Sequence, residues 1–286
     1  MALRTPAASV DRVHRLAFLG AGTMGGTIVA GLVRAGRDAA GIAVTTHTPA
    51  HREKLAAELG VQAFADNRQA AAWASTIVIG VKPADALALL DEISPELGPD
   101  NVVISLCAGL STDLLSAHLP PAVHVVRVMP NTPASVGAGM AGVSGGRTAT
   151  EHDVQAAITL MSAVGRAVAI PEQLQDPLTA ISGSGPAYVF AFVEALIEAG
   201  VTQGLPRGLA TELATQTLLG SARLLDEGND SVTQLREAVT SPGGTTAAAL
   251  RELDDHGLRS AVQDAVEACA RRSAELAAAA EQADAR

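Results

Sequence analysis

Lysine, cysteine and aromatic residues are all scarce in this 286-residue chain. The lysines are Lys54 and Lys82, so the second half of the chain has none. The cysteines are Cys107 and Cys269, which suits a protein of a reducing compartment better than a disulfide scaffold. Because aromatic residues make up only 2% of the chain, packing must rely on the close approach of small aliphatic side chains.

An excess of positive charge and a long apolar run are also missing. The formal net charge is −10 and the isoelectric point is about 5.1, which argues against nucleic acid or an anionic membrane as the main partner. No apolar run reaches the length of a membrane span, and residues 1–14 lack the apolar segment of a signal peptide. We therefore expect a cytoplasmic protein whose residues 1–14 form a disordered lead-in.

The order of the apolar runs predicts two domains. In the first part of the chain, strand-like runs alternate with helical segments, which indicates βαβ units and a mainly parallel sheet. After residue 171 the periodicity is helical throughout. We expect an α/β Rossmann-type doubly wound domain at residues 15–171 and an all-α domain at residues 172–286. The strands are expected at residues 15–19, 42–46, 76–81, 102–106, 124–129, 139–144 and 167–170.

The helix expected at residues 186–199 is apolar on nearly every side. A helix of this kind must be buried all round. The helical part as a whole is too apolar for a small monomeric bundle, so we expect a homodimer that shares these helices.

Three glycines form the nucleotide-binding signature GxGxxG. Gly20 permits a tight turn, Gly22 lets a pyrophosphate approach the backbone, and Gly25 lets the following helix pack on the strand. The motif follows a predicted strand and opens a predicted helix, which is the context that the signature requires. The pattern therefore favours a dinucleotide cofactor over a merely structural turn.

The residues after the second predicted strand favour NADP. Enzymes that prefer NAD usually carry Asp or Glu there, but this chain has Thr46, His47 and Thr48, with Arg52 one helical turn later. Hydroxyls and an arginine suit a 2′-phosphate, so we predict NADPH, with NADH as an alternative. Alternatively, Arg52 is a solvated surface residue. The same alternative holds for Lys82, which follows the strand-like run at residues 76–81.

The segment 240–246, with the sequence TSPGGTT, predicts a small anion cradle. Its glycines and hydroxyls stand at the start of a predicted helix. Backbone N–H groups there have no intrahelical partner, and the helix dipole favours negative charge. We expect this TSPGGTT loop to hold a substrate carboxylate.

The chain has no Lys or His in the TSPGGTT motif that could donate a proton, which narrows the types of reduction that it can catalyse. Hydride reduction of a ketone makes an alkoxide that needs an acid such as Lys or His. The lysine that β-hydroxyacid dehydrogenases carry on the helical domain has no counterpart here. A protonated C=N bond already carries its proton, so positioning and a hydrogen-bond partner for the nitrogen are enough. The sequence therefore favours reduction of an imine.

Other polar residues have structural interpretations. We expect Cys107 to be inert and His124 to be a satisfied core residue, and no metal-ligand spacing is present. Asn67 begins a predicted helix and is alternatively only its cap. Asn131 and Thr132 either line the site or form a structural turn.

Five motifs, in this order, resemble the Δ1-pyrroline-5-carboxylate reductase family: FLGAGTMG, VKP, MPNTP, SGSGPAY and SPGGTT. The resemblance covers nearly the whole chain. It implies NAD(P)H-dependent reduction of the C=N bond of 1-pyrroline-5-carboxylate to L-proline, the last step of proline biosynthesis. It also implies a Rossmann domain followed by a helical dimerisation domain, with dimers often assembling further, commonly into decamers of five dimers.

The resemblance also implies roles for individual residues. Thr246 would hydrogen-bond the ring nitrogen of the substrate as the catalytic residue. The substrate-binding residues would be Ser241, Gly243, Gly244, Thr245 and Thr246. The cofactor-binding residues would be Gly20, Ala21, Gly22, Thr23, Met24, Thr46, His47, Thr48, Asn67, Val81, Lys82, Pro83, Ala108 and Gly109, to which the residue pattern adds Arg52.

Three rival functions are weighed against this one. A reductase of a six-membered imine, such as piperideine carboxylate, would use the same loop. A β-hydroxyacid dehydrogenase is disfavoured by the missing lysine. A nucleotide-sensing dimer without catalysis is expected to have lost Thr246 or the second glycine pair, Gly243 and Gly244. Both features are present.

Overall fold

The computed structural model describes residues 15–285, which fall into two compact units. The first unit contains the described residues up to Gly183 and again from Cys269, and the second is Ser184–Ala268. The predicted lead-in at residues 1–14 lies outside the described residues. Residues 172–183 and 269–285, expected in the helical domain, therefore pack with the nucleotide-binding part of the chain. A functional domain boundary at residue 171 stays a prediction.

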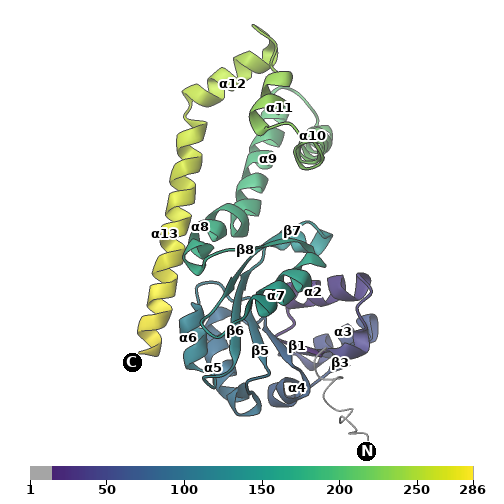
Figure 1. Cartoon of the computed structure of the whole chain (residues 1–286). Helices are drawn as coiled ribbons and strands as arrows, with labels where there is room; N and C mark the ends of the chain where they lie inside the picture. The colour runs from purple at the N-terminus through teal and green to yellow at the C-terminus, as the bar shows by residue number, and fades with distance from the viewer. Residues whose placement is uncertain (1–14, 286) are drawn as a thin grey trace, which may run out of the picture. The chain divides into compact units, whose positions relative to one another are not determined.

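An eight-stranded sheet forms the centre of the first unit (Figure 1). The strand order is β3-β2-β1-β4-β5-β6-β7-β8, and all neighbours are parallel except β6 and β7. The order reverses between β1 and β4, which is the point where doubly wound sheets bind ligands. The predicted fold class is confirmed. The strands are β1 (Leu16–Leu19), β2 (Ile42–Thr45), β3 (Gln62–Ala63), β4 (Thr76–Ile79), β5 (Val102–Ser105), β6 (His124–Met129), β7 (Gly139–Gly145) and β8 (Gly165–Ala169).

Alternate residues of the strands fill two separate hydrophobic cores, one on each face of the sheet. In β1, Leu16 and Phe18 join one core, whereas Ala17 and Leu19 join the other. This is why β1 reads as a continuous apolar run rather than as an alternating one. Helices α2 (Thr23–Arg34), α3 (Pro49–Leu59) and α7 (Glu151–Ser162) cover the first face, and α4 (Asn67–Trp73), α5 (Pro83–Ile93) and α6 (Thr112–Ala117) cover the second.

The second unit is helical, and much of its apolar surface is uncovered in a single chain. Phe190 and Phe192 are 66% and 50% exposed, and no residue of their helix, α9, is buried. The expectation of all-round burial for this helix is therefore wrong for one chain, because the other helices of its unit do not enclose it. The helices are α9 (Gly185–Thr202), α10 (Arg207–Glu227), α11 (Val232–Ala238), α12 (Thr245–Asp255) and the first part of α13 (Leu258–Asp284).

Among residues 15–285, one stretch is long and apolar enough to cross a membrane by length and composition alone, so the expectation that no apolar run reaches that length is wrong. It is Glu172–Thr202, which includes α8 (Gln175–Leu178) and α9. A single helix of this kind is weak support for a membrane span, because an apolar helix of a soluble protein passes the same test.

The short strand β3 was not predicted. It consists of Gln62 and Ala63 only, and both residues are exposed. Two residues are too few to show an alternating pattern, and their backbone pairing with β2 is a tertiary contact that local periodicity does not reveal.

Candidate functional site

The carboxyl ends of β1, β2, β4 and β5 meet at one edge of the sheet, because these strands are parallel neighbours. β1 ends in a turn at Gly20, whose φ of 82° lies in the left-handed region. A Cβ at Gly20 would stand 2.8 Å from the backbone nitrogen of Val81, so the turn requires glycine. The N–H of Gly20 donates to Thr45 Oγ1 at 3.2 Å, and that of Ala21 donates to the Thr45 carbonyl at 2.8 Å. The ends of β2 and β4 therefore hold this turn in place.

Gly22 leaves open space in front of α2. It is the N-cap of the helix, and a Cβ there would meet no atom of residues 15–285 within 4 Å. No side chain caps the helix, so the N–H groups of its first turn, at Thr23 and Met24, lack a side-chain acceptor. Gly25 packs against the turn, where a Cβ would stand 3.2 Å from the carbonyl oxygen of Gly20. This open helix start fits the pyrophosphate of a dinucleotide.

A set of polar groups suited to a phosphate follows β2. Thr46 Oγ1 donates to the carbonyl of Thr48 at 2.8 Å, while the side chains of His47 and Thr48 are exposed. Arg52 is half-buried in the first turns of α3, and its guanidinium has no hydrogen-bond or ion-pair partner among residues 15–285. Helix α3 also begins without a side-chain cap. An unpaired cation beside an uncapped helix start attracts an anionic group.

Two further loops leave the same edge of the sheet. Lys82, the N-cap of α5, is exposed, and its ammonium forms no ion pair within the described part of the chain. Pro83 is the first residue of α5. After β5, Ala108 is exposed, whereas Gly109 is buried and has a φ of 74° that favours glycine. The structure therefore brings the 81–83 and 108–109 segments to the edge that carries the glycine-rich turn.

Cys107 lies next to these loops as a protonated thiol. Its Sγ donates to the carbonyl of half-buried Val81 at 3.4 Å. Burial raises the pKa of the Cys107 thiol to about 11, although a hydrogen bond with Ser105 acts in the opposite direction. A thiol with so high a pKa carries almost no thiolate near neutral pH, which agrees with the predicted inert role.

The side chain of Asn67 does not cap a helix, which was one of the two roles that the sequence suggested for it. It begins α4, but the cap is Asp66, whose side chain accepts from the N–H groups of Arg68 and Gln69. The Asn67 amide donates to the carboxylate of Glu92 at 3.2 and 3.4 Å. The alternative interpretation of Asn67 as a helix cap is therefore wrong, and its contact with a cofactor stays a prediction.

In the second unit, the TSPGGTT loop leads into an uncapped N-terminus of α12. Gly243 has a φ of 69°, and Gly244 is the N-cap, packed so that a Cβ there would collide with Ser241 Oγ. The hydroxyls of Ser241, Thr245 and Thr246 have no hydrogen-bond partner among the described residues. The loop therefore offers backbone N–H groups and free hydroxyls but no charged side chain, a combination suited to a small carboxylate.

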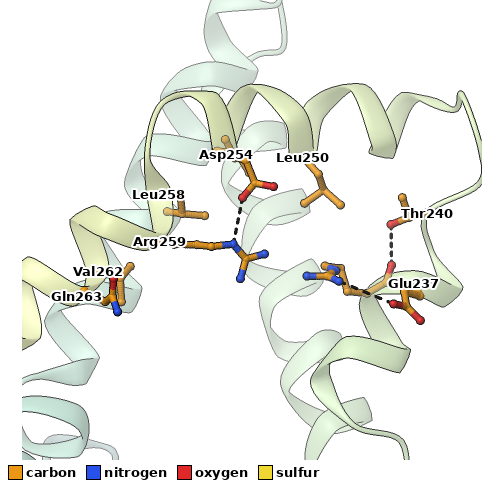
Figure 2. A pocket seen from close by; sticks show the side chains of 10 residues that line it. Glu237, Thr240, Leu250, Asp254, Leu258, Arg259, Val262 and Gln263 are labelled. Carbon is orange, nitrogen blue, oxygen red and sulfur yellow. Dashed lines mark hydrogen bonds and ion pairs between the residues drawn. The ribbon is translucent and has the colours of Figure 1, made fainter.

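A hollow of about 930 Å³ lies in the second unit where α11, α12 and α13 approach one another (Figure 2). Its charged groups are already paired: Arg259 Nε lies 3.2 Å from Asp254, and Arg236 lies 3.9 Å from Glu237. No residue from Ser241 to Thr246 lines it, so the hollow is separate from the TSPGGTT loop. The lining residues are Arg236, Glu237, Thr240, Leu250, Leu253, Asp254, Leu258, Arg259, Val262 and Gln263.

His51 contacts the glycine-rich turn and was missed by the sequence analysis. Its Nε2 lies 3.2 Å from the carbonyl oxygen of Ala21. The sequence shows only that it lies four residues after His47, in the first turn of the helix that starts at Pro49. That spacing alone does not show that the ring reaches the turn at the end of β1.

Two other polar residues have structural roles. The Asn131 amide donates to the carbonyl of Ser182 at 3.0 Å, and its Oδ1 accepts from the N–H of Met140 at 2.8 Å. Both ends of this buried side chain are engaged, which supports the structural-turn interpretation. His124 Nδ1 lies 2.8 Å from Asp153 Oδ2, so the ring has the expected partner, but its side chain is 27% exposed and is not a core residue.

Two family models match the chain. Residues 172–276 match the family described as pyrroline-5-carboxylate reductase dimerisation. Residues 15–109 match the family described as NADP oxidoreductase, coenzyme F420-dependent.

Sequences and solved structures of similar proteins agree with these matches. Pyrroline-5-carboxylate reductases of Pseudomonas aeruginosa and Corynebacterium melassecola are 38% and 40% identical to this chain, with 92% and 91% of the chain and 97% and 98% of the relative covered. The structure of a pyrroline-5-carboxylate reductase from Coxiella burnetii superposes with a TM-score of 0.89 at 38% identity, covering 92% of this chain and 98% of the other. The structure of the Plasmodium falciparum pyrroline carboxylate reductase, solved with NADP bound, superposes with a TM-score of 0.83 at 31% identity. The match covers 93% of this chain and 99% of the other.

Proposed function

The chain belongs to the pyrroline-5-carboxylate reductase family, and on that premise we propose how its own residues carry the reaction. It is an oxidoreductase that uses NAD(P)H to reduce the C=N bond of 1-pyrroline-5-carboxylate to L-proline, the last step of proline biosynthesis. The observation that carries our proposal is the TSPGGTT loop, with its uncapped helix start, its free hydroxyls and no side-chain acid. A substrate with a carboxylate and a protonated ring nitrogen matches these groups.

The cofactor is NADP(H). We place the pyrophosphate against the start of α2. The space in front of Gly22 supports this placement, because it is open and a methyl group on Gly22 would fill it. The 2′-phosphate would lie by Arg52, whose guanidinium is unpaired among the described residues. The residues proposed to hold the cofactor are Gly20, Ala21, Gly22, Thr23, Met24, Thr46, His47, Thr48, Arg52, Asn67, Val81, Lys82, Pro83, Ala108 and Gly109.

In the proposed chemistry, the protein orients the substrate and supplies no acid. When bound, the reduced nicotinamide supplies the hydride that the imine carbon of the ring, C2 of the pyrroline, receives. The substrate carboxylate is held by Ser241, Gly243, Gly244 and Thr245, and Thr246 Oγ1 hydrogen-bonds the ring nitrogen. The iminium nitrogen keeps the proton that it brought, so the product is an amine and no Lys or His acid is required.

The exposed apolar helices support a homo-oligomer. The family match at residues 172–276 is to a dimerisation domain, and Phe190, Leu196, Leu213 and Leu224 are between 43% and 66% exposed in one chain. We propose that a second copy covers these side chains, and that five such dimers assemble into a decamer. The apolar stretch Glu172–Thr202 would then be buried in the dimer and not in a membrane, in a cytoplasmic enzyme.

The experiment that tests the function is a spectrophotometric assay of NADPH and NADH oxidation with pyrroline-5-carboxylate, with piperideine carboxylate as the alternative substrate. We expect turnover of the five-membered imine with kcat/KM well above that of the six-membered one. A higher kcat/KM for the six-membered imine would assign the enzyme to the alternative substrate. No oxidation with either imine would contradict the proposed chemistry.

Replacing Arg52 with alanine is expected to raise KM for NADPH about tenfold and to leave KM for NADH nearly unchanged. The reason is that only NADPH carries a phosphate for the guanidinium, and a charge-assisted hydrogen bond contributes on the order of 1.5–3 kcal/mol. Lys54→Ala is the matched control, because Lys54 lies on the same helix and pairs with Glu58 at 3.8 Å. Equal changes in the two KM values for Arg52→Ala would rule out the 2′-phosphate contact.

A further inference from the structure

The C-terminal part of α13 packs along the first unit through one narrow face. From Cys269 onward the helix belongs to that unit. Ala270, Ser273, Ala277 and Ala280 are half-buried at spacings of three and four residues, while most residues between them are exposed. Such spacing defines a single stripe on a helix. Because three of the four side chains are alanines, the helix backbone approaches the unit closely.

This stripe covers the turn that follows β5. A Cβ at Gly109 would stand 3.8 Å from the backbone nitrogen of Ala277, and Gly109 is buried although neighbouring Ala108 is exposed. Ala280 packs against the hydrophobic core on that face of the sheet. The last turns of α13 therefore lie directly against Ala108 and Gly109, which we propose above as cofactor-binding residues and here assign to the nicotinamide end.

A polar contact joins the same two segments one turn further along α13. Ser111 Oγ donates to Glu281 Oε1 at 3.0 Å and accepts from the N–H of Leu114 at 3.2 Å. Ser111 is the N-cap of α6 and comes two residues after Gly109. The Ser111 hydroxyl thus acts as both donor and acceptor, and its hydrogen bonds link the start of α6 to α13.

Two more hydrogen bonds fix the helix on either side of this contact. Ser273 Oγ donates to Asp176 Oδ1 of α8 at 2.7 Å. His118 Nε2 lies 2.9 Å from Asp284 Oδ1, and its Nδ1 lies 2.8 Å from Asp91 Oδ1. The match to the dimerisation family ends at residue 276, so Glu281 and Asp284 lie outside it.

We propose that the last turns of α13 position the Ala108–Gly109 turn for the nicotinamide, and that Glu281 is the positioning residue that acts through Ser111. This rests on the proposed role of Ala108 and Gly109 in cofactor binding. The physical reason is that the turn has a glycine in a left-handed conformation and an exposed neighbour, so its geometry depends on what covers it. Helix α13 supplies both the cover over Gly109 and the acceptor for the Ser111 hydroxyl.

The test compares wild-type enzyme with Glu281→Ala, Glu281→Gln and Glu275→Ala. Glu281→Ala removes the acceptor of the Ser111 hydroxyl, so we expect KM and Kd for NADPH to rise about fivefold, with kcat and the melting temperature close to wild type. Glu281→Gln keeps an acceptor oxygen and is expected to restore both constants. Glu275→Ala is the matched control, because Glu275 lies on the same helix and, within the described part of the chain, pairs only along that helix, with Arg272 at 2.8 Å.

Cofactor constants of Glu281→Ala equal to those of the wild type would overturn the inference. A lower melting temperature with unchanged cofactor constants would also overturn it, because that result shows a merely structural contact. Failure of the proposed function is a separate result, namely no turnover of either imine by the wild type. The Kd for NADPH, measured by fluorescence without substrate, still tests the role of Glu281 in that case.

The contact of His118 with α13 makes this docking sensitive to pH. Partial burial lowers the pKa of His118, but hydrogen bonds and charges from Asp91 of α5 and Asp284 of α13 outweigh it, so the pKa lies above the ordinary value. Because the folded-state pKa is the higher one, the contribution to stability is complete below the ordinary pKa of about 6.5 and is lost as the pH rises through the raised pKa.

Hydrogen exchange measures this loss of docking. After correction for the intrinsic rate, the amides in the last turns of α13 are expected to lose protection as the pH rises from 6 to about 9. Asp284→Asn removes the charge that binds the imidazolium, so protection in that variant is expected to vary less with pH. The same pH dependence in Asp284→Asn and wild type would show that His118 does not hold the helix.

Discussion

The Gly22→Ala variant is expected to melt within about 3 °C of the wild type and to bind NADPH roughly tenfold more weakly or worse. Its fold is preserved because a Cβ at Gly22 meets no atom of the described residues within 4 Å and the φ of −76° is open to any residue. The added methyl group occupies the space in which a pyrophosphate approaches the N–H groups of α2. Isothermal titration with NADPH and thermal unfolding of the same samples measure the two quantities.

Two other glycines provide the comparisons for Gly22. A methyl group added at Gly98 would also meet no atom within 4 Å, its φ is not left-handed, and it lies outside the proposed site, so Gly98→Ala should change neither quantity. Gly20→Ala should lower the melting temperature as well as NADPH affinity, because its φ is 82° and the Cβ would crowd the Val81 backbone. Wild-type affinity in Gly22→Ala would show that the pyrophosphate does not lie at α2.

Thr246→Ala is expected to lower kcat/KM for pyrroline-5-carboxylate by a factor of about 5–150. This corresponds to the loss of one hydrogen bond to a charged nitrogen, on the order of 1–3 kcal/mol. Some activity should remain, because the iminium brings its own proton and the backbone N–H groups of the loop still hold the carboxylate. Steady-state kinetics with NADPH at saturation measure the change.

Thr246→Ser is the matched control, since it keeps the hydroxyl and removes only a methyl group. We expect it to retain most of the wild-type kcat/KM. The KM for NADPH should be unchanged in both variants, because Thr246 belongs to the substrate loop. Equal activity of Thr246→Ala and wild type would remove Thr246 from the reaction and leave the loop as a carboxylate site only.

Local patterns were enough to predict most of the nucleotide-binding fold. β6 was expected at residues 124–129 and forms there, because a run of β-branched residues bounded by turns is a local signal. The two residues of β3 have no such signal and depend on pairing with Ala43 and Val44. The apolar character of α9 was clear from its sequence, but its exposure of Phe190 and Phe192 was not, because burial depends on which other helices surround it.

The candidate site divides in the same way. GxGxxG and TSPGGTT are short motifs whose chemistry follows from glycine conformation and helix ends, so the sequence alone indicates an anion site at each. The contact of His51 with Ala21 joins residues that are 30 positions apart, so local sequence periodicity does not predict it. The same holds for Asn67, whose amide is held by Glu92.

The sequence alone was enough to predict the order of the elements except β3, the two anion-binding loops and the lack of a side-chain acid, because each is a property of adjacent residues. Only the tertiary structure decided which groups are free and which are engaged. It leaves Arg52 without a partner among the described residues, and it joins Ser111 to Glu281 across 170 residues of chain. The physical reason is that hydrogen bonds and burial depend on neighbours in space, which the packing of the sheet and helices selects.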